Sequence, residues 1–407
     1  MANTSILDSA FDDGTFQKNP FSIYQALHGA GGRHVFCEAW NAPVFFKYAD
    51  AAEILRRPLE FSNRGRVVNH LKRTFPTEAS GELKPLADHY SAGLINSDPP
   101  DHTRLRKLIQ QAFLPRTLER LRPRVDEICT DLIARLRYLG TTDFVAEFAF
   151  QLPVTVIAEM LGIPHAMREQ FKEWSVRIVE FMASPNPPLE AMRRSQAALL
   201  ELRAYFTSVF EERRRQPGED VISILVNARE SGDKLTEEEL LSTCVTLLIG
   251  GHETTTSLLA SSLWLIGTHP GLRDDLILHP ELMPSAVEEF LRVQPPFHRI
   301  LRVVSSDIEF ADARLKEGQT IVLLLGAANR DGAQFSDPDR VDIRRSPNKH
   351  VSFGYGMHHC LGAGLARIEA PAALGRLLRA FPQFECEPNP QWHDGMVRSI
   401  KRLQVSL

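Results

Sequence analysis

The chain has 407 residues, of which 43% are hydrophobic and 24% are charged, and its net charge is −4. This balance is ordinary for a globular protein, and it lacks the basic excess that usually marks nucleic-acid binders. The first residues carry neither a basic region nor an apolar run, which excludes an ordinary secretory signal. No uncharged apolar run reaches the length of a membrane span. We therefore expect a cytoplasmic protein that binds neither nucleic acid nor a membrane.

The cysteines are odd in number, widely spaced, and form no C-x-x-C pair. They are Cys37, Cys129, Cys244, Cys360 and Cys386. This arrangement argues against a disulfide framework or a zinc ribbon, and a reducing compartment fits it best.

The first third of the chain is mixed in pattern. Short apolar runs around Pro43 predict strands and turns over residues 35–48, and a short helix follows over residues 49–56. Residues 63–96 carry scattered glycines and prolines and predict a long irregular loop. Loops of that length are usually functional.

From residue 101 onward, apolar residues recur every three or four positions, which predicts helices. These helices span residues 104–113, 118–139, 154–161, 167–182, 190–215 and 221–229. The longest predicted helix begins at Thr236, which forms a capping box with Glu239. It runs to Thr268, where His269-Pro270 stops it. At 1.5 Å per residue it would span about 48 Å, enough to cross the molecule.

The last third predicts a helix over residues 283–293, strands over 300–310 and 320–325, and a final helix over 361–380. Pro371 falls inside that final helix and should kink or split it. No repeat or flexible linker divides the chain. We therefore expect a single domain over residues 1–407, mainly α with a small β part.

A cysteine follows two closely spaced glycines in residues 353–367, FGYGMHHCLGAGLAR. Gly354 and Gly356 would let the backbone turn tightly and approach something flat. Cys360 is predicted to stand at the start of a helix, where free N–H groups and the helix dipole favour a thiolate. A lone thiolate suits one axial bond to iron rather than a tetrahedral zinc site. A buried cysteine in a glycine-rich turn is the alternative interpretation.

This segment resembles the signature of the cytochrome P450 family, F-G-x-G-x-H-x-C-x-G-x-x-L-A-R, and fills every fixed position of it. The resemblance implies the cytochrome P450 fold, with a long central helix crossing a haem, and haem b (iron protoporphyrin IX) as cofactor. It implies that Cys360 is the iron ligand and that His358 hydrogen-bonds a haem propionate. Phe353 would pack beside the thiolate, while Gly354, Gly356 and Gly362 would serve as turn and clearance positions.

The long predicted helix contains Gly250-Gly251-His252-Glu253-Thr254 in its apolar middle. Each interior glycine costs roughly 1 kcal/mol relative to alanine, and a buried carboxylate is costly unless it is bonded or functional. A ligand groove would account for both costs, and a simple kink is the alternative. His252-Glu253 also begins an H-E-x-x-H zinc pattern, but Thr256 stands where the second histidine would be.

The same segment is similar to the family's oxygen-activation motif, A/G-G-x-D/E-T. On that resemblance, Gly250 and Gly251 open a groove for dioxygen. Thr254 would hydrogen-bond the bound dioxygen, and Glu253 would relay protons to it, because splitting the O–O bond takes up two protons.

Charged residues elsewhere match further positions of the family. Glu289 and Arg292 are three residues apart on one helix face; they resemble the family's fixed structural ion pair, with Arg340 as the expected third member. Haem propionates need cations or donors, and the resemblance gives that role to residues in three places. These are His102 and Arg106, Arg302, and His358. For each one alone, an ordinary surface charge is the alternative.

The resemblance implies a monooxygenase that activates O2 with external electrons and hydroxylates or epoxidises a small organic substrate, in secondary or catabolic metabolism. Because the chain has no flavin or iron–sulfur motif, we expect electrons from a ferredoxin and a ferredoxin reductase that uses NAD(P)H. A basic surface should help an acidic ferredoxin to dock. The candidate residues for this surface are Arg104, Lys107, Arg116 and Arg120.

The expected substrate pocket is largely apolar, and the protein is expected to be a monomer. The candidate pocket residues are Leu247, Phe297, Ile300 and Phe181. Three other functions remain possible on the same fold: oxidative coupling, desaturation and peroxide-driven oxidation. Glu253 and Thr254 favour dioxygen, because peroxide-driven members often lack that pair. A haem sensor or carrier without catalysis is the non-enzymatic alternative, and the intact acid–alcohol pair argues against it.

Overall fold

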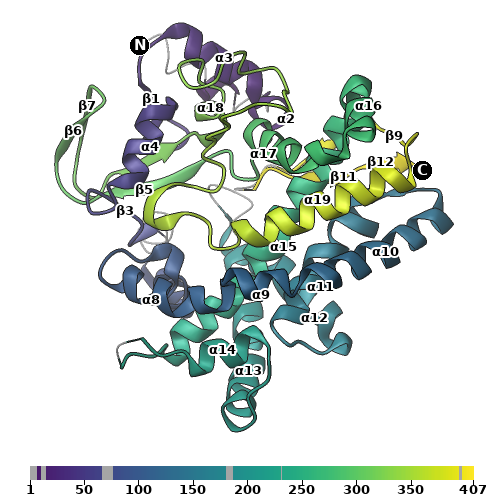
Figure 1. Cartoon of the computed structure of the whole chain (residues 1–407). Helices are drawn as coiled ribbons and strands as arrows, with labels where there is room; N and C mark the ends of the chain where they lie inside the picture. Colours follow the sequence, from purple (N-terminus) through teal and green to yellow (C-terminus); the bar gives the residue numbers. More distant parts are fainter. Residues whose placement is uncertain (1–6, 11–14, 67–76, 180–186, 231, 394–396) are drawn as a thin grey trace. The chain divides into compact units, whose positions relative to one another are not determined.

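The computed structural model of the chain describes residues 7–10, 15–66, 77–179, 187–230, 232–393 and 397–407 (Figure 1). It is mainly helical with a small β part, which confirms the predicted fold class. The chain forms two compact units. Unit 1 comprises residues 1–62, 122–152 and 254–407, and unit 2 comprises residues 63–121 and 153–253. Within the described part of the chain, no helix combines the length and apolar character that crossing a membrane requires.

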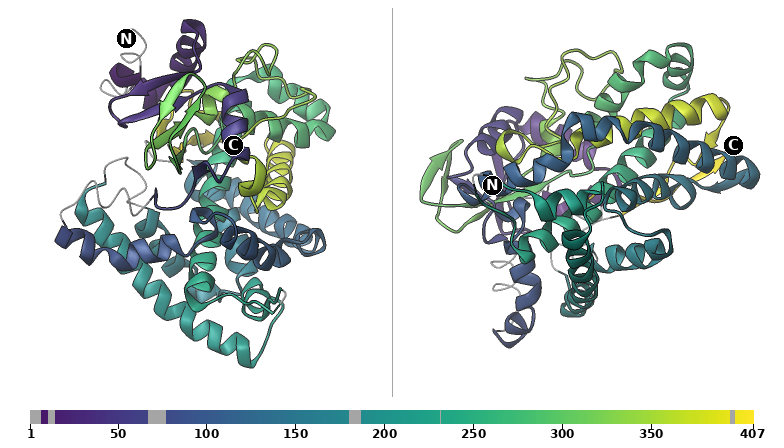
Figure 2. Two further views of the ribbon diagram at one scale, coloured as in Figure 1. Left: turned by 90° about the vertical axis from the view of Figure 1, so that its left-hand side faces the viewer. Right: turned by 60° about the horizontal axis from the view of Figure 1, so that its bottom comes forward.

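The largest sheet, in unit 1, has five strands in the order β1-β2-β8-β5-β3. Its strands are β1 (His34–Cys37), β2 (Ala42–Phe45), β3 (Phe61–Ser62), β5 (Ile300–Val304) and β8 (Thr320–Leu323). Only the β2–β8 pair in this sheet is parallel. Strands from the two ends of the chain therefore lie side by side, purple against light green in Figures 1 and 2.

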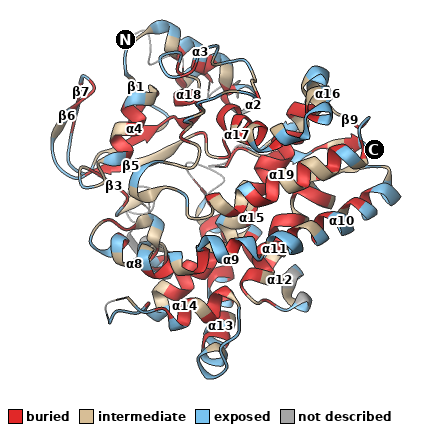
Figure 3. Cartoon of the chain, viewed as in Figure 1, coloured by how far each residue is buried: buried red, intermediate tan, exposed pale blue. Residues whose placement is uncertain are grey.

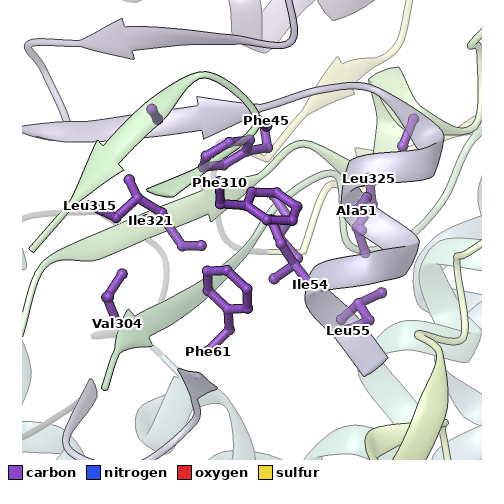
Figure 4. Packing of buried hydrophobic residues seen from close by; sticks show 14 of the residues in the cluster. Phe45, Ala51, Ile54, Leu55, Phe61, Val304, Phe310, Leu315, Ile321 and Leu325 are labelled. Atoms are coloured by element: carbon purple, nitrogen blue, oxygen red, sulfur yellow. The ribbon is translucent and has the colours of Figure 1, made fainter. Parts of the chain in front are cut away.

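Both faces of this sheet are covered, which explains why β8 reads as a continuous apolar run. Successive strand residues point to opposite faces. Ile321 and Leu323 pack into one hydrophobic cluster with residues of α4 (Tyr48–Arg56). Figure 4 shows Ile321 in this cluster. Val322 packs into a second cluster with α3 (Pro20–Ala30). A strand that is buried on both faces is apolar along its length and does not alternate between polar and apolar residues.

Three smaller sheets complete the β part of unit 1. They are the pair β6 (Ile308–Phe310) and β7 (Ala313–Leu315), the pair β10 (Gln391–Trp392) and β11 (Ile400–Arg402), and the triple β4 (Thr141–Asp143), β12 (Gln404–Ser406) and β9 (Glu385–Cys386).

The larger helices of unit 1 surround α19 (Ala363–Ala380), which packs against α10 (Arg122–Leu139), α17 (Met283–Val293) and α16 (Pro270–Leu278). Helix α10 is buried on one side only, as Figure 3 shows. The short elements of this unit are α2 (Thr15–Lys18), η3 (Val145–Ala149), η6 (Pro280–Leu282), α18 (Leu325–Ala328) and η7 (Gly356–His358). Pro371 lies inside α19, which runs through it as one helix, so the predicted split does not occur.

Unit 2 is helical. Its longer helices are α8 (Asp101–Ile109), α12 (Arg168–Val179), α13 (Leu189–Arg215), α14 (Val221–Asn227) and most of α11 (Gln151–Met160). Its short ones are α6 (Thr77–Glu82), α7 (Lys84–Ser91), η1 (Leu94–Asn96), η2 (Gln110–Phe113), α9 (Pro115–Glu119) and η4 (His165–Met167). Aromatic side chains centred on Phe171 and Phe206 join α12 to α13.

Two predictions about secondary structure were wrong. Residues 63–96, predicted to form an irregular loop, contain α6 and α7. These short helices have too few regularly spaced apolar residues to be predicted, and their stability depends on tertiary packing. The predicted helix over residues 118–139 is two helices, α9 and α10, and Pro123 sits in the first turn of the second, a position where proline is tolerated.

The longest helix, α15 (Glu237–Thr268), agrees with the prediction. Its start is the expected capping box: the Glu239 N–H donates to Thr236 Oγ1 at 3.2 Å, and the Thr236 N–H donates to Glu239 Oε2 at 2.8 Å. It ends before His269, and Pro270 opens the next helix. Helix α15 belongs to unit 2 up to Glu253 and to unit 1 from Thr254.

Candidate active site

Cys360 lies in the loop between η7 and α19, and its side chain is exposed. Its N–H donates to the Phe353 carbonyl oxygen at 2.8 Å, which closes the loop. Gly354 and Gly356 have φ of +71° and +70°, a left-handed conformation that favours glycine. A Cβ on Gly356 would also come within 2.8 Å of the Leu55 carbonyl oxygen. The two glycines thus serve the tight turn that presents the thiol.

The cysteine stands just before the helix rather than in its first turn. Helix α19 begins at Ala363, and Gly362 is its N-cap. A Cβ on Gly362 would lie 3.9 Å from Cys360 Sγ, an ordinary van der Waals distance. Glycine at this position therefore adds clearance beside the sulfur, although an alanine would not clash with it.

The middle of α15 has an accessible stripe, whereas residues 241–245 and 255–263 on either side of it are buried. Its accessible positions include Thr246, Leu247, Gly250, Glu253 and Thr254. These positions recur every three or four residues and so lie on one face. A Cβ added to Gly250 would meet nothing within 4 Å. The stripe therefore borders open space, as a ligand groove requires.

The two glycines of the motif have different roles. A Cβ on Gly251 would lie 2.7 Å from the side chain of Ile157 on α11, closer than real Cβ contacts come. Gly251 therefore allows α11 to pack closely against α15. Sequence spacing did not indicate this packing role, and the predicted part of Gly251 in a dioxygen groove stays a prediction.

Glu253 is half-buried on the accessible stripe. Desolvation by burial raises the pKa of its carboxyl to about 7. A carboxyl with such a pKa holds its proton in roughly half of the molecules at neutral pH. The adjacent Thr254 is also half-buried. An acid and an alcohol next to each other on a partly accessible helix face can take part in proton transfer.

His252 belongs to the buried side of α15. Its Nδ1 donates to the Leu248 carbonyl oxygen at 2.7 Å, so its Nε2 can accept from the Ser175 hydroxyl of α12 at 3.2 Å. Burial lowers its pKa. A neutral, hydrogen-bonded histidine that links two helices is a structural group rather than a metal ligand.

Glu369 is a buried acid that sequence reasoning missed. It lies on α19 at 1% exposure, and burial raises the pKa of its carboxyl to about 8, with the hydroxyl of Thr255 opposing the shift. The available signal was its spacing, because Glu369 stands four residues after Leu365 and four before Ala373, both buried. A carboxyl on the apolar face of a helix is expensive to ionise, which favours the protonated form of Glu369.

Glu289 and Arg292 form a fully buried ion pair on α17, with two hydrogen bonds of 2.7 and 2.8 Å. Arg292 also donates to the carbonyl oxygens of Asn329, Pro338 and Arg340. The predicted third member, Arg340, was wrong: its carbonyl accepts from Arg292, while the guanidinium that reaches Glu289 is that of Arg345, at 3.2 Å. The chain turns between these two arginines, and spacing alone does not show which side chain points inward.

The candidate propionate ligands are distributed over both units. His102 and Arg106 are i, i+4 neighbours on α8 of unit 2; burial, and then the Arg106 charge, lowers the pKa of His102 to about 4. In unit 1, Arg302 is buried on β5, and His358 is half-buried in η7. Their joint role stays a prediction.

Among the candidate pocket residues, Leu247, Phe297 and Ile300 are half-buried. Phe297 pairs with Val397 through an isolated β-bridge, and Ile300 packs against the hydrophobic cluster that contains Ile321 and Leu323. Phe181 lies outside the described residues.

Two of the four candidate docking cations have acidic partners in unit 2. Arg104 forms an ion pair with Glu239, and Lys107 forms one with Glu230 at 3.3 Å. Arg116 and Arg120 are exposed. Among these four residues, Arg116 on α9 and Arg120 just after α9 therefore present more exposed positive charge than Arg104 and Lys107 on α8.

These features fit a haem held by one thiolate. The loop presents an exposed sulfur with a glycine clearance beside it, and α15 offers an open stripe with no side chain at Gly250. A haem needs a ligand for its iron and space free of side chains, and each unit by itself offers one of these features.

The comparisons with known proteins agree with this fit. The family model described as cytochrome P450 matches residues 66–278 and 273–406. The chain is 41% identical over 322 residues to the putative cytochrome P450 YjiB of Bacillus subtilis (strain 168), covering 77% of this chain and 80% of that one. It is 40% identical over 328 residues to the mycinamicin IV hydroxylase/epoxidase of Micromonospora griseorubida, covering 79% and 81%.

Among solved structures, the chain resembles P450BioI in complex with hexadec-9Z-enoic acid ligated acyl carrier protein. The TM-score is 0.88 at 34% identity, over 97% of this chain and 100% of that one. These matches establish a monooxygenase that acts on a small organic molecule, with iron protoporphyrin IX as its cofactor. The chain belongs to the cytochrome P450 family.

Proposed function

We propose that Cys360 would hold the haem iron and that Glu253 and Thr254 deliver the protons used in oxygen activation. The accessible stripe of α15, with a carboxyl of pKa about 7 on it, carries the second part of this proposal. When bound, the haem supplies the oxygen binding and electron acceptance that no side chain offers. The Glu253 carboxyl holds a proton and passes it on, and Thr254 Oγ1 donates a hydrogen bond into the open space that Gly250 leaves.

The remaining family positions would hold the cofactor. His102, Arg106, Arg302 and His358 would bind its propionates, since cations and N–H donors are what a carboxylate requires. Phe353 would pack beside the thiolate. Gly354, Gly356 and Gly362 would shape the loop, and the ion pair of Glu289 with Arg292 would hold the chain segments behind it.

Substitution of the acid–alcohol pair is expected to uncouple electron use from product formation. With Thr254→Ala or Glu253→Gln, product formed per NAD(P)H consumed should fall at least about tenfold, because positioned proton transfer contributes 10²-fold or more. The raised pKa of Glu253 leaves it protonated below about pH 7. Coupling of the unsubstituted enzyme should therefore decline as pH rises above 7, and Glu253→Gln should remove that decline.

Ser262→Ala, a change on α15 two turns further along, is the matched control and should leave coupling unchanged. The proposed roles are wrong if both variants couple as well as the control at every pH.

We propose that the electron donor is a ferredoxin reduced by an NAD(P)H-dependent ferredoxin reductase, and that it docks at Arg116 and Arg120. Their exposure supports this choice over Arg104 and Lys107, whose charges are partly neutralised by acidic neighbours. A basic surface raises the association rate of an acidic partner.

The double substitution Arg116→Gln with Arg120→Gln should slow haem reduction by ferredoxin several-fold at low ionic strength. The difference should vanish at high salt, because salt screens exposed charges. Arg104→Gln, as the control, should have a smaller effect. Equal rates for the double variant and the unsubstituted protein in stopped-flow reduction across salt concentrations would exclude this surface.

We further propose a cytoplasmic monomer whose 407 residues form one cytochrome P450 domain, with a largely apolar substrate from secondary or catabolic metabolism. The apolar side chains of Leu247 in unit 2 and of Phe297 and Ile300 in unit 1 are half-buried, which supports contacts with such a substrate. Titrating a compound panel for a spin-state shift of the haem would identify the substrate class.

A further inference from the structure

We propose that Arg367 and Glu288 form a charged pair that positions Phe353 against the Cys360 loop and sets how strongly the sulfur donates to the iron. The pair lies entirely in unit 1, on α19 and α17. This inference rests on the proposed ligation by Cys360 and deepens it: Arg367 is a positioning residue that acts through Phe353 and through its charge.

Arg367 contacts the loop through an aromatic ring. Its guanidinium carbon lies 4.6 Å from the centre of the Phe353 ring, within the range of a cation–π interaction. The carbonyl of the same Phe353 accepts the Cys360 N–H at 2.8 Å. The Phe353 side chain thus contacts Arg367, while the Phe353 carbonyl accepts the hydrogen bond that closes the loop. A shift of this residue would therefore also shift that hydrogen bond.

Glu288 holds the guanidinium in that place. Arg367 Nε and Nη2 donate to the two carboxylate oxygens of Glu288 at 2.8 and 2.9 Å, a two-point contact that fixes the plane of the group. His350 Nε2 lies 3.2 Å from a carboxylate oxygen of Glu288. The centre of the His350 ring is 6.0 Å from the centre of the Phe353 ring. Phe353 thus has Arg367 and His350 as neighbours, both joined to Glu288.

The charges of the pair act on the sulfur with opposite signs. Arg367 contacts Phe353, whose carbonyl accepts the Cys360 N–H, and the Glu288 carboxylate, followed by the more weakly acting Cys360, raises the pKa of Arg367. A positive charge near a thiolate stabilises the electron-rich state and makes reduction of the iron easier, whereas the negative charge of Glu288 opposes it. The Arg367 side chain is 43% exposed and that of Glu288 25%, so solvent weakens both effects.

The pair borders an open pocket lined by Pro284, Ser285, Val287, Glu288, Arg367 and Pro371. Pro371 follows Arg367 by four residues, and a proline has no N–H to donate to the carbonyl four residues before it. The backbone at Arg367 therefore lacks one helical hydrogen bond.

The test is the reduction potential of the haem-loaded protein in three variants, measured by spectroelectrochemistry at low salt. Arg367→Gln should lower the potential and Glu288→Gln should raise it, each changing the equilibrium constant of one-electron reduction by about tenfold, equivalent to about 59 mV. Arg367→Lys keeps the charge and should restore most of the potential. Both shifts should shrink at high salt.

Arg376→Gln is the matched control, because Arg376 lies on the same helix with 28% of its side chain exposed and pairs with Asp126 at 2.9 Å. It should leave the potential unchanged. The inference would be overturned if the two Gln variants shifted the reduction potential in the same direction. It would also be overturned if Arg367→Lys had the same potential as Arg367→Gln, because the pair would then be only a structural contact. The spectrum of the reduced carbon monoxide complex separates this failure from that of the proposed function: without thiolate ligation, the unsubstituted protein itself lacks the red-shifted Soret band.

Discussion

Replacing Cys360 with alanine is expected to abolish the red-shifted Soret band of the reduced carbon monoxide complex and to remove monooxygenase activity. Loss of a direct ligand should exceed the roughly 10- to 100-fold effects that follow from changing groups around a ligand. The measurement is the reduced, carbon monoxide-treated spectrum of the purified variant, followed by product formation with saturating electron donor.

The physical reason is that the other cysteines are unsuited to ligation. Burial raises the pKa of Cys37 and Cys129 to about 12, and that of Cys386 to about 11. Burial raises the pKa of Cys244 further still. A metal ligand must be a thiolate, and Cys360 is the exposed one of the five.

Cys386→Ala serves as the control and should keep both the spectrum and the activity. If the Cys360→Ala protein retained a normal red-shifted band with a full complement of haem, the assignment of the ligand would have to be abandoned.

Replacing Arg292 with methionine is expected to reduce the free energy of unfolding by about 3 to 5 kcal/mol, the cost of breaking a buried ion pair by removing one partner. Both side chains of the pair have 0% exposure. The substitution would leave the Glu289 carboxylate with only the more distant Arg345 as a cation and would deprive three backbone carbonyls of a donor. An unsatisfied buried polar group costs the full energy of its desolvation.

The chain offers a matched control on its surface. Arg314 pairs with Glu309 at 3.1 Å, and the two side chains are 87% and 78% exposed. Arg314→Met should therefore change stability by less than about 1 kcal/mol. Denaturant unfolding of both variants gives the comparison, and a similar loss in the two would contradict the structural role of the buried pair.

Much of the fold followed from local rules. The capping box at Thr236 and the proline after His269 bounded α15 correctly, because caps and stop signals depend on neighbouring residues in the chain. The segment from Phe353 to Arg367 indicated a glycine-turned loop before a helix for the same reason. The helices α6 and α7 were missed, because short polar helices depend on packing partners that local spacing does not reveal.

The sequence by itself determined the family, and it pointed to the proposed sulfur ligand and acid–alcohol pair, since each depends on residue types at fixed spacing. Only the tertiary structure decided that Arg345 rather than Arg340 contacts Glu289 and that Glu369 is buried. It also decided that Gly251 leaves room for Ile157, whereas a Cβ on Gly250 would meet nothing within 4 Å. Each of these depends on which side chains from distant segments come together. Burial and Coulomb interactions are set by distance in space, which separation along the chain does not fix.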